Sequence, residues 1–224
     1  LCFLRHATSK IKQSKDLFDL KFMGFRGEAL SSIASVSQMT IISNNDDQTE
    51  IGNKIKINAG QLVLEEEQAL KKGTSISVEN LFFNIPARRN FLKSDSVELR
   101  HIIDEFHRIS LINHNINFIL INNGNEIFNL KKSIFKERII RIFGKSSLEK
   151  LVPIDEVTDF VNINGFIYKP DFARKTKTAQ FFFVNNRFIK NHHLNHAVKS
   201  AYEGLIDDKY FPSYFLNFEV PNNT

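Results

Sequence analysis

The sequence predicts an α+β protein made of two successive layered units, and three observations carry this prediction. Segments with the period of strands occur along the whole chain, with helix-period segments between them. Strands and helices do not follow the regular alternation of a doubly wound parallel fold. Two asparagine-rich turns each join a pair of strand-like segments, as antiparallel hairpins require. We expect the first unit to span residues 1–130 and the second residues 131–224.

In the first unit, residues Glu28 to Val36 are predicted to form a helix because Leu30, Ile33 and Ala34 share one face. The segment after Leu64 is acidic, which predicts an exposed linker there. A later helix is indicated by apolar residues at helical spacing from Leu99 to Ile109. Strands are expected at Met39–Ile42, Lys54–Asn58, Gln61–Leu64, Thr74–Val78, Ile116–Ile121 and Glu126–Leu130.

The second unit is predicted to begin with a basic amphipathic helix, Lys131–Phe143, closed by Gly144. A strand over Val161–Tyr168 follows, and then a loop rich in lysine, arginine and threonine. The segment Phe181–Ile189 predicts a hairpin that turns at its two asparagines. A helix over His193–Leu205 and a final strand over Tyr214–Val220 complete the expected elements.

Composition limits the classes of protein that the chain can belong to. The 224 residues are 42% hydrophobic and 25% charged, as in an ordinary globular protein. Cys2 is the single cysteine, which excludes an internal disulfide framework and fits a reducing compartment. No apolar run has the length of a membrane span, so we expect no membrane partner.

The net charge of +5 is unevenly placed. Residues 1–130 carry 15 basic and 15 acidic side chains, whereas residues 131–200 carry 14 basic and 6 acidic ones. This excess predicts a surface in the second unit that faces a polyanion. The alternative is a solvated basic face with no specific partner.

The segment Gly24–Leu30 is the most informative motif. Two glycines three residues apart allow the backbone to approach a ligand closely, and the residues after them start a helix. The start of a helix presents unpaired N–H groups and the positive end of the helix dipole, which together favour a phosphate. Spacing alone leaves a plain loop-to-helix junction equally open.

A set of ordered motifs resembles one known family. These motifs are Arg5–Lys10, Gly24–Leu30, Gly73-Thr74, Leu81–Leu92, Phe183–Arg187 and Asn195–Ala197. They resemble the N-terminal ATPase half of the MutL family of DNA mismatch repair proteins over essentially the whole chain. The resemblance implies a partial GHKL (Bergerat-type) ATPase sandwich, followed by a ribosomal-protein-like βαβ domain. The stretch Leu81–Leu92 argues against other GHKL members, such as gyrase B subunits and heat-shock chaperones.

The resemblance also implies where ATP, with Mg²⁺, is bound in the intact parent protein. The side chains of Thr8, Ser9 and Lys10 are expected near the phosphates, and the backbone N–H groups of Gly27, Glu28, Ala29 and Leu30 around them. The hydroxyl of Thr74 is expected at the adenine end, although a threonine at the start of a strand also fits β propensity.

Two charged residues of the motif have open roles. Arg26 either reaches a phosphate or ties the lid down through a carboxylate. Glu28 stands at the helix start, where a carboxylate complements the dipole, so we do not expect it to be the catalytic base.

Several hydrolytic motifs of the family do not occur in this sequence. These are the glutamate that activates water, the asparagine that holds Mg²⁺, the Asp-x-Gly-x-Gly turn that reads adenine, and the lysine loop that meets the γ-phosphate. We therefore expect the chain to be an internal fragment that binds ATP poorly and hydrolyses it negligibly. No catalytic residue is assigned to it.

The basic residues of the second unit predict sequence-independent DNA binding. The candidates are Lys175, Lys177, Arg187, Lys190 and His192. The family has a functional arginine at the position of His192, so this chain departs there from the pattern. The neighbouring histidines lack cysteine or carboxylate partners at ligand spacing, so we expect no metal site.

The function that these expectations support is an ATP-binding matchmaker in DNA mismatch repair, which couples nucleotide state to DNA and partner binding. Its expected partners are DNA, a mismatch-recognition protein and a downstream nuclease or helicase. The parent is expected to be a homodimer in the bacterial cytoplasm, associated with the nucleoid. The alternative is a truncated remnant that acts only as a DNA-binding or interaction module without ATPase activity.

Overall fold

The computed structural model describes residues 3–13, 16 and 23–220. The chain divides into two compact units, Leu1–Ser94 and Asp95–Thr224. This division lies earlier than the boundary between residues 130 and 131 that we predicted. Helix α3 (Asp95–Ile112) and the hairpin of β5 (Phe118–Asn122) and β6 (Asn125–Leu130) belong to the second unit, because α3 and β6 contact helix α4 (Phe135–Phe143).

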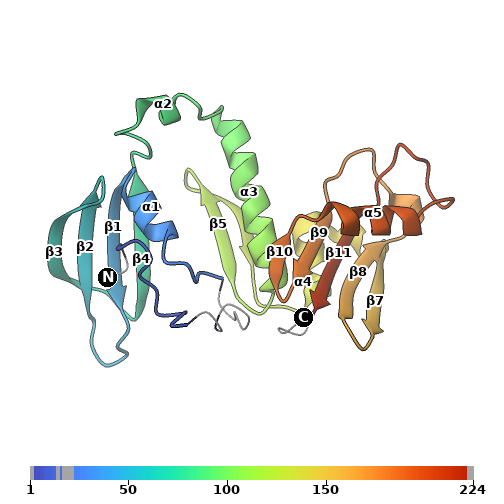
Figure 1. Ribbon diagram of the computed structural model, residues 1–224, viewed down its shortest axis with the longest axis horizontal. Coiled ribbons are helices and arrows are strands. Elements are labelled where there is room, and N and C mark those ends of the chain that lie inside the picture. The colour runs from blue at the N-terminus through green and yellow to red at the C-terminus, as the bar shows by residue number, and fades with distance from the viewer. Residues whose placement is uncertain (1–2, 14–15, 17–22, 221–224) are drawn as a thin grey trace. The chain divides into compact units, whose positions relative to one another are not determined.

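The first unit contains a four-stranded antiparallel sheet in the order β3-β2-β1-β4 (Figure 1). Its strands are β1 (Gln38–Asn44), β2 (Ile51–Asn58), β3 (Gln61–Ala69) and β4 (Gly73–Glu79). Helix α1 (Ala29–Ala34) packs on one face of the sheet through Ala34, which shares a small core with Met39, Ile41 and Ile57. The alternation of buried and exposed residues along β1 is what a half-covered strand predicts.

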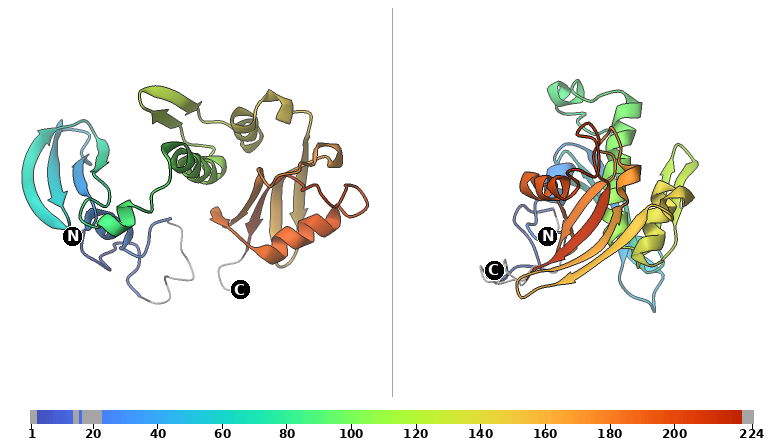
Figure 2. Two further views of the ribbon diagram at one scale, coloured as in Figure 1. Left: turned by 90° about the horizontal axis from the view of Figure 1, so that it is seen from above. Right: turned by 90° about the vertical axis from the view of Figure 1, so that its right-hand side faces the viewer.

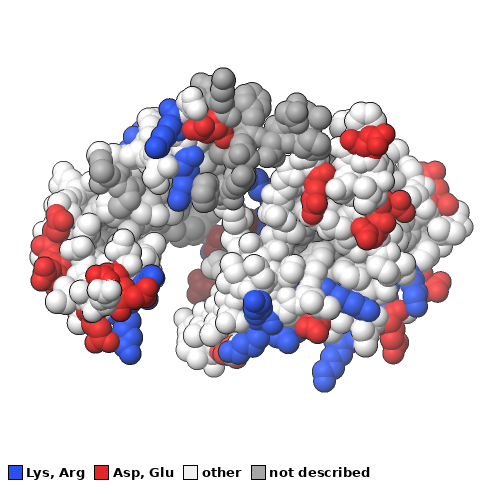
Figure 3. All heavy atoms as spheres, turned by 90° about the horizontal axis from the view of Figure 1, so that it is seen from below, with Lys and Arg blue, Asp and Glu red and all other residues white. Residues whose placement is uncertain are grey.

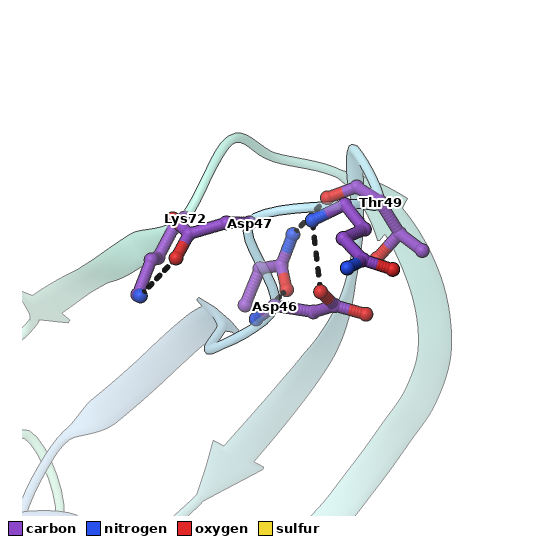
Figure 4. A network of polar contacts seen from close by, with 6 residues as sticks. Asp46, Asp47, Thr49 and Lys72 are labelled. Atoms are coloured by element: carbon purple, nitrogen blue, oxygen red, sulfur yellow. Dashed lines mark hydrogen bonds and ion pairs between the residues drawn. The ribbon is translucent and has the colours of Figure 1, made fainter.

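The turn between β1 and β2 is held by the buried side chain of Asn44. Its Nδ2 donates to the carbonyl oxygens of Thr49 at 2.6 Å and Leu70 at 2.9 Å, and its Oδ1 accepts from the backbone N–H of Asp46. In the same turn, the carboxylate of Asp47 pairs with Lys72 at 2.5 Å (Figure 4). These contacts connect the turn to the end of β3.

The acidic linker predicted after Leu64 is wrong, because β3 continues to Ala69. Its glutamates lie opposite β2, and Lys54 Nζ contacts Glu66 Oε1 at 2.7 Å across the pair of strands. A cross-strand ion pair thus stabilises acidic residues in an exposed strand that composition alone assigns to a loop.

Three short helices among the described residues lie between the larger elements. Helix α2 (Pro86–Arg89) begins with its proline at the first helical position, where the missing N–H has no intrahelical partner. The 3₁₀ helices η2 (Lys145–Ser147) and η3 (Pro170–Phe172) lie in the second unit.

The second unit is built on a five-stranded mixed sheet in the order β10-β9-β11-β8-β7, whose strands are labelled in Figure 1 and seen from two further directions in Figure 2. Its strands are β7 (Leu151–Val157), β8 (Asn162–Tyr168), β9 (Gln180–Val184), β10 (Arg187–Ile189) and β11 (Tyr214–Glu219). Strands β9 and β11 are parallel and are connected through β10 and helix α5 (His192–Ala201). This arrangement contains the βαβ element that the family resemblance implies.

Both faces of this sheet are covered. Phe181 and Phe183 of β9 belong to the core on the side of α3 and α4, whereas Phe182 belongs to the core on the side of α5. Period-two geometry sends successive side chains to opposite faces. A run of three phenylalanines therefore marks a central strand buried on both sides.

Strand β7 was not predicted from the sequence. It is an edge strand that contains Pro153, and proline is tolerated there because one side of an edge strand needs no N–H for the ladder. The two asparagine turns are confirmed, since Asn123, Gly124, Asn185 and Asn186 all have positive φ. The predicted helix at Lys131–Phe143 begins only at Phe135, and the predicted helix at His193–Leu205 ends at Ala201.

Candidate functional site

The first unit contains an open cavity of about 1030 Å³ between its N-terminal segment and the start of α1. Among the described residues, two stretches line it, His6–Lys10 and Met23–Leu30. These stretches contain two of the motifs on which the predicted phosphate site rests. Thr8, Ser9, Lys10 and Arg26 thus lie around one cavity with residues 27–30.

Gly27 brings the two stretches together. It has φ +68°, a conformation that side chains disfavour. A Cβ atom at this position would lie 2.4 Å from the carbonyl oxygen of Ala7. The carbonyl oxygen of Gly27 accepts from the backbone N–H of His6 at 3.1 Å. The glycine is therefore required both by its own backbone conformation and by the approach of the N-terminal segment.

The chain changes from coil to helix at Glu28, as the anion-site prediction requires. Glu28 is the N-cap residue of α1, and its side chain makes no capping hydrogen bond. Within the described part of the chain, the backbone N–H groups of residues 27–30 have no hydrogen-bond acceptor. Ala29 and Leu30 open α1, and the first N–H groups of a helix have no intrahelical partner, which makes them suitable donors to an anion.

The carboxylate of Glu28 is held by two basic side chains. His6 Nδ1 lies 3.0 Å from Oε1, and Arg26 Nε lies 3.0 Å from Oε2. The side chain of Glu28 is 32% exposed, whereas those of His6 and Arg26 are about three-quarters exposed. This geometry corresponds to the carboxylate-binding alternative for Arg26.

The other nucleotide candidates divide into two groups. Thr8 accepts a hydrogen bond through Oγ1 from the backbone N–H of Lys10 at 3.1 Å, which shapes the segment beside the cavity. Thr74 is the second residue of β4 and does not line the cavity. Its hydroxyl lies 2.8 Å from that of Ser43 on β1. The structure therefore does not bring Thr74 together with the other candidates.

The second unit has a smaller cavity of about 320 Å³. Two DNA-binding candidates, Lys177 and Lys190, line it together with Arg108 of α3. Arg108 stacks over Phe188, with its guanidinium carbon 4.6 Å from the ring centre, and it also forms an ion pair with Glu105. Arg108 was not among the predicted DNA-binding residues, because no local signal links α3 to a loop that follows about 70 residues later.

The remaining DNA candidates lie outside this cavity. Lys175 lies over the ring of Tyr210, 5.9 Å from its centre. Arg187 begins β10, and His192 is the first residue of α5, whose N-cap residue Asn191 accepts from the backbone N–H of Leu194. The structure thus brings two of the five candidates into one cavity.

Arg138 is counted in the basic excess of the second unit but does not lie on its surface. It is fully buried, and its Nη1 donates to the carbonyl oxygen of Ser110 at 2.9 Å. Its Nη2 donates to the carbonyl oxygens of His114 and Ile116, at 2.9 and 2.7 Å. Burial lowers the pKa of this guanidinium, and the nearby Arg141 lowers it further. This arginine connects α4 to the end of α3 and the start of β5, and is not exposed to a polyanion.

The distribution of surface charge is mixed. On the face drawn in Figure 3, each unit carries both acidic and basic side chains, without a continuous field of one sign. Within residues 3–13, 16 and 23–220, no group of three or more histidine, cysteine, aspartate or glutamate side chains is arranged to hold a metal ion. Over the same residues, no helix is long and apolar enough to cross a membrane.

A family model, curated relatives and solved structures all match this chain and agree with the resemblance that the sequence motifs indicate. The family model described as "DNA mismatch repair protein, C-terminal domain" matches residues 139–224. A DNA mismatch repair protein MutL from Flavobacterium psychrophilum is 57% identical over 224 residues, which are 100% of this chain and 36% of that protein. The chain thus spans about a third of the length of the curated relatives it matches.

Two solved structures are similar over most of the chain. The ATPase domain of Aquifex aeolicus MutL complexed with ADP is 27% identical, with a TM-score of 0.71 over 94% of this chain and 76% of that one. The N-terminal domain of a DNA repair protein is 25% identical, with a TM-score of 0.80 over 99% of this chain and 69% of that one.

The mixed α+β architecture and the cavity at the start of α1 define a protein of the GHKL ATPase fold class. The relatives from Flavobacterium psychrophilum and Flavobacterium johnsoniae, which match the entire chain at 57% and 53% identity, are both DNA mismatch repair proteins MutL. The chain belongs to the MutL family of DNA mismatch repair proteins.

Proposed function

We propose that this chain forms part of the nucleotide-binding and DNA-binding half of a mismatch repair matchmaker, in which nucleotide state controls DNA and partner binding. The cavity of the first unit is the observation that carries this proposal. Four N–H groups without acceptors among the described residues, a glycine without space for a side chain, and a flanking lysine together form a cradle for phosphate oxygens.

The residues present fit a nucleoside phosphate. The amides of residues 27–30 would hold phosphate oxygens, and Lys10 would supply positive charge beside them. The relative from Aquifex aeolicus is described as complexed with ADP, which supports this class of ligand. Mg²⁺ would neutralise phosphate charge when bound, but the described residues offer it no cluster of ligands, so we assign it to none of them. Thr74 remains our proposal for the adenine end.

DNA is the second proposed ligand. Lys177, Lys190 and Arg108 converge on one cavity of the second unit, and Lys175, Arg187 and His192 extend the set along neighbouring segments. Basic groups of this kind contact phosphates and give affinity that depends on salt but not on base sequence. Such affinity suits a repair factor that acts anywhere on a chromosome, which leads us to propose the nucleoid in the bacterial cytoplasm as its place of action.

The partners follow from this role. We propose that the whole protein is a homodimer that contacts a mismatch-recognition protein and then a nuclease or helicase. Hydrolysis of ATP is assigned to no residue of this chain. The alternative, a module that binds DNA without responding to nucleotide, is separated from the main proposal by the experiment below.

The substitution Gly27→Ala tests the nucleotide site in the full-length gene product. The added methyl group would lie 2.4 Å from the carbonyl oxygen of Ala7, on a backbone with φ +68°. We expect binding of ADP, measured by isothermal calorimetry, to fall by more than about tenfold. The control Gly124→Ala strains a positive-φ turn of the second unit without a close contact.

Two results would count against the proposal. ADP binding that survives Gly27→Ala excludes the cradle. A wild-type protein that binds duplex DNA without any response to ADP or ATP supports the nucleotide-independent module instead.

A further inference from the structure

Glu28 has a position that normally interferes with anion binding. As the N-cap residue of α1, its carboxylate can accept hydrogen bonds from the N–H groups of Leu30 or Ser31. A capped helix start offers fewer donors to a phosphate, and the carboxylate adds a like charge beside it. A phosphate cradle that begins with a glutamate therefore needs a way to keep that side chain elsewhere.

The structure contains such an arrangement. Glu28 makes no capping bond, because its two oxygens are directed to His6 Nδ1 and Arg26 Nε, each at 3.0 Å. The two basic groups come from the two stretches that line the cavity, His6 from the N-terminal segment and Arg26 from the loop before α1. Each carboxylate oxygen has one basic partner, so neither is turned toward the amides of α1.

We propose that His6 and Arg26 are positioning residues for Glu28: they hold its carboxylate off the start of α1 and so keep the amides of residues 27–30 open for an anion. The inference rests on the proposed nucleotide function and deepens it. Arg26 then promotes phosphate binding without touching phosphate, and Glu28 opposes binding unless it is held.

The test is a set of substitutions in the full-length gene product, with the affinity for the non-hydrolysed analogue AMPPNP as one measurement. We expect Arg26→Ala to weaken binding about threefold, and His6→Ala with Arg26→Ala about tenfold, because exposed ion pairs of this kind have modest strength. Glu28→Gln alone is expected to tighten binding about twofold. Added to the double variant, Glu28→Gln should restore the affinity.

A second measurement needs no nucleotide. Hydrogen–deuterium exchange of a peptide spanning residues 27–36 should slow in His6→Ala with Arg26→Ala, because the released carboxylate then caps the first turn of α1. Adding Glu28→Gln should remove part of this protection, since the amide oxygen of glutamine is a weaker cap. Lys54→Ala, which removes a basic partner from another ion pair in the same unit, is the matched control and should change neither measurement.

The outcomes separate the roles. If Arg26→Ala still weakens binding in the Glu28→Gln background, Arg26 contacts phosphate itself and the inference is wrong. If Glu28→Gln alone weakens binding, Glu28 tethers the N-terminal segment instead, which also overturns it. A wild-type protein that does not bind AMPPNP refutes the proposed function, and the exchange measurement alone then decides the inference.

Discussion

The two sheets of the molecule differ in how the chain covers them. In the first unit α1 covers part of one face, and Ile76 and Val78 of β4 remain 49% and 44% exposed. In the second unit both faces are packed, and Phe183, Phe215 and Tyr214 are fully buried. The cavity of the first unit is thus lined by two stretches outside its sheet, His6–Lys10 and Met23–Leu30, whereas the second sheet depends on tight side-chain packing on both faces. This contrast predicts where substitutions act on stability and where they act on binding.

The largest expected effect lies in the second core. Phe183→Ala should lower the free energy of unfolding by about 3–5 kcal/mol, because it removes a buried ring from a packed cluster. The half-exposed Ile76 is the matched site in the first sheet, and Ile76→Ala should cost less than about 1.5 kcal/mol. Urea unfolding followed by circular dichroism measures both. Equal losses would show that the two sheets are equally packed.

Arg138→Met tests whether a buried polar connection matters as much as the aromatic core. The variant keeps much of the side-chain volume but leaves the carbonyl oxygens of Ser110, His114 and Ile116 without their donor. We expect a loss of about 2–3 kcal/mol in the free energy of unfolding. Arg141→Met, at an exposed site on the same helix, should cost less than about 0.5 kcal/mol. If the two variants behave alike, the buried network contributes little.

Charge reversal in the second unit should change DNA binding and leave stability unchanged. Arg187→Glu with Lys190→Glu removes two proposed phosphate contacts, so the slope of log K against log salt should become shallower by about 2. Filter binding to duplex DNA at several salt concentrations measures it. Lys145→Glu with Lys209→Glu changes the net charge equally outside the predicted set. Identical slopes for both pairs would indicate a diffuse charge effect without a groove.

The smallest expected effect is the change in the free energy of unfolding with pH. His107 lies between the rings of Phe128 and Phe143, and its Nε2 is buried without a hydrogen-bond partner. Burial lowers the pKa of this imidazole below 6.5, with Asp104 acting weakly in the opposite direction. The unfolded chain then binds the proton more readily, so stability should be complete above pH 6.5 and fall as the pH drops below it.

Unfolding of the wild type and of His107→Leu between pH 5 and pH 8 checks this sign. The variant should lose the part of the acid dependence that His107 contributes, while His101→Leu, at an exposed site of the same helix, should keep it. An unchanged profile in His107→Leu would mean that the proton reaches His107 without disturbing the core.

Elements that depend on residues within their own segment were predictable from the sequence. The hairpin turns followed from their asparagines, and the central strand β9 from its three phenylalanines. Edge strand β7 and the extension of β3 could not be predicted from the sequence, because both depend on pairing with a neighbouring strand that no local pattern reveals. The division of the chain after Ser94 likewise depends on the packing of α3 against α4, which joins segments about 30 residues apart.

In the candidate sites too, local features were predictable from the sequence and tertiary contacts were not. The loop Gly24–Leu30 and its helix start were predictable from glycine spacing. The ion pairs of His6 and Arg26 with Glu28 were not predictable, because the His6 pair depends on how the separate N-terminal segment folds back onto this loop. Arg108 was missed and Arg138 was counted as surface charge for the same reason. Sequence indicates which charges exist, and tertiary packing decides which of them face solvent.

The order of strands in the second unit also bears on how the protein is made on the ribosome. Strand β11 is the last of its sheet to be synthesised, yet it lies between β8 and β9 and is the strand that joins the pair β7–β8 to the pair β9–β10. Until residue 219 has left the exit tunnel, the nascent chain can form two hairpins but no continuous sheet. The apolar faces of these hairpins therefore stay exposed until β11 has been synthesised. During this interval a chaperone that binds the nascent chain would cover the largest apolar surface.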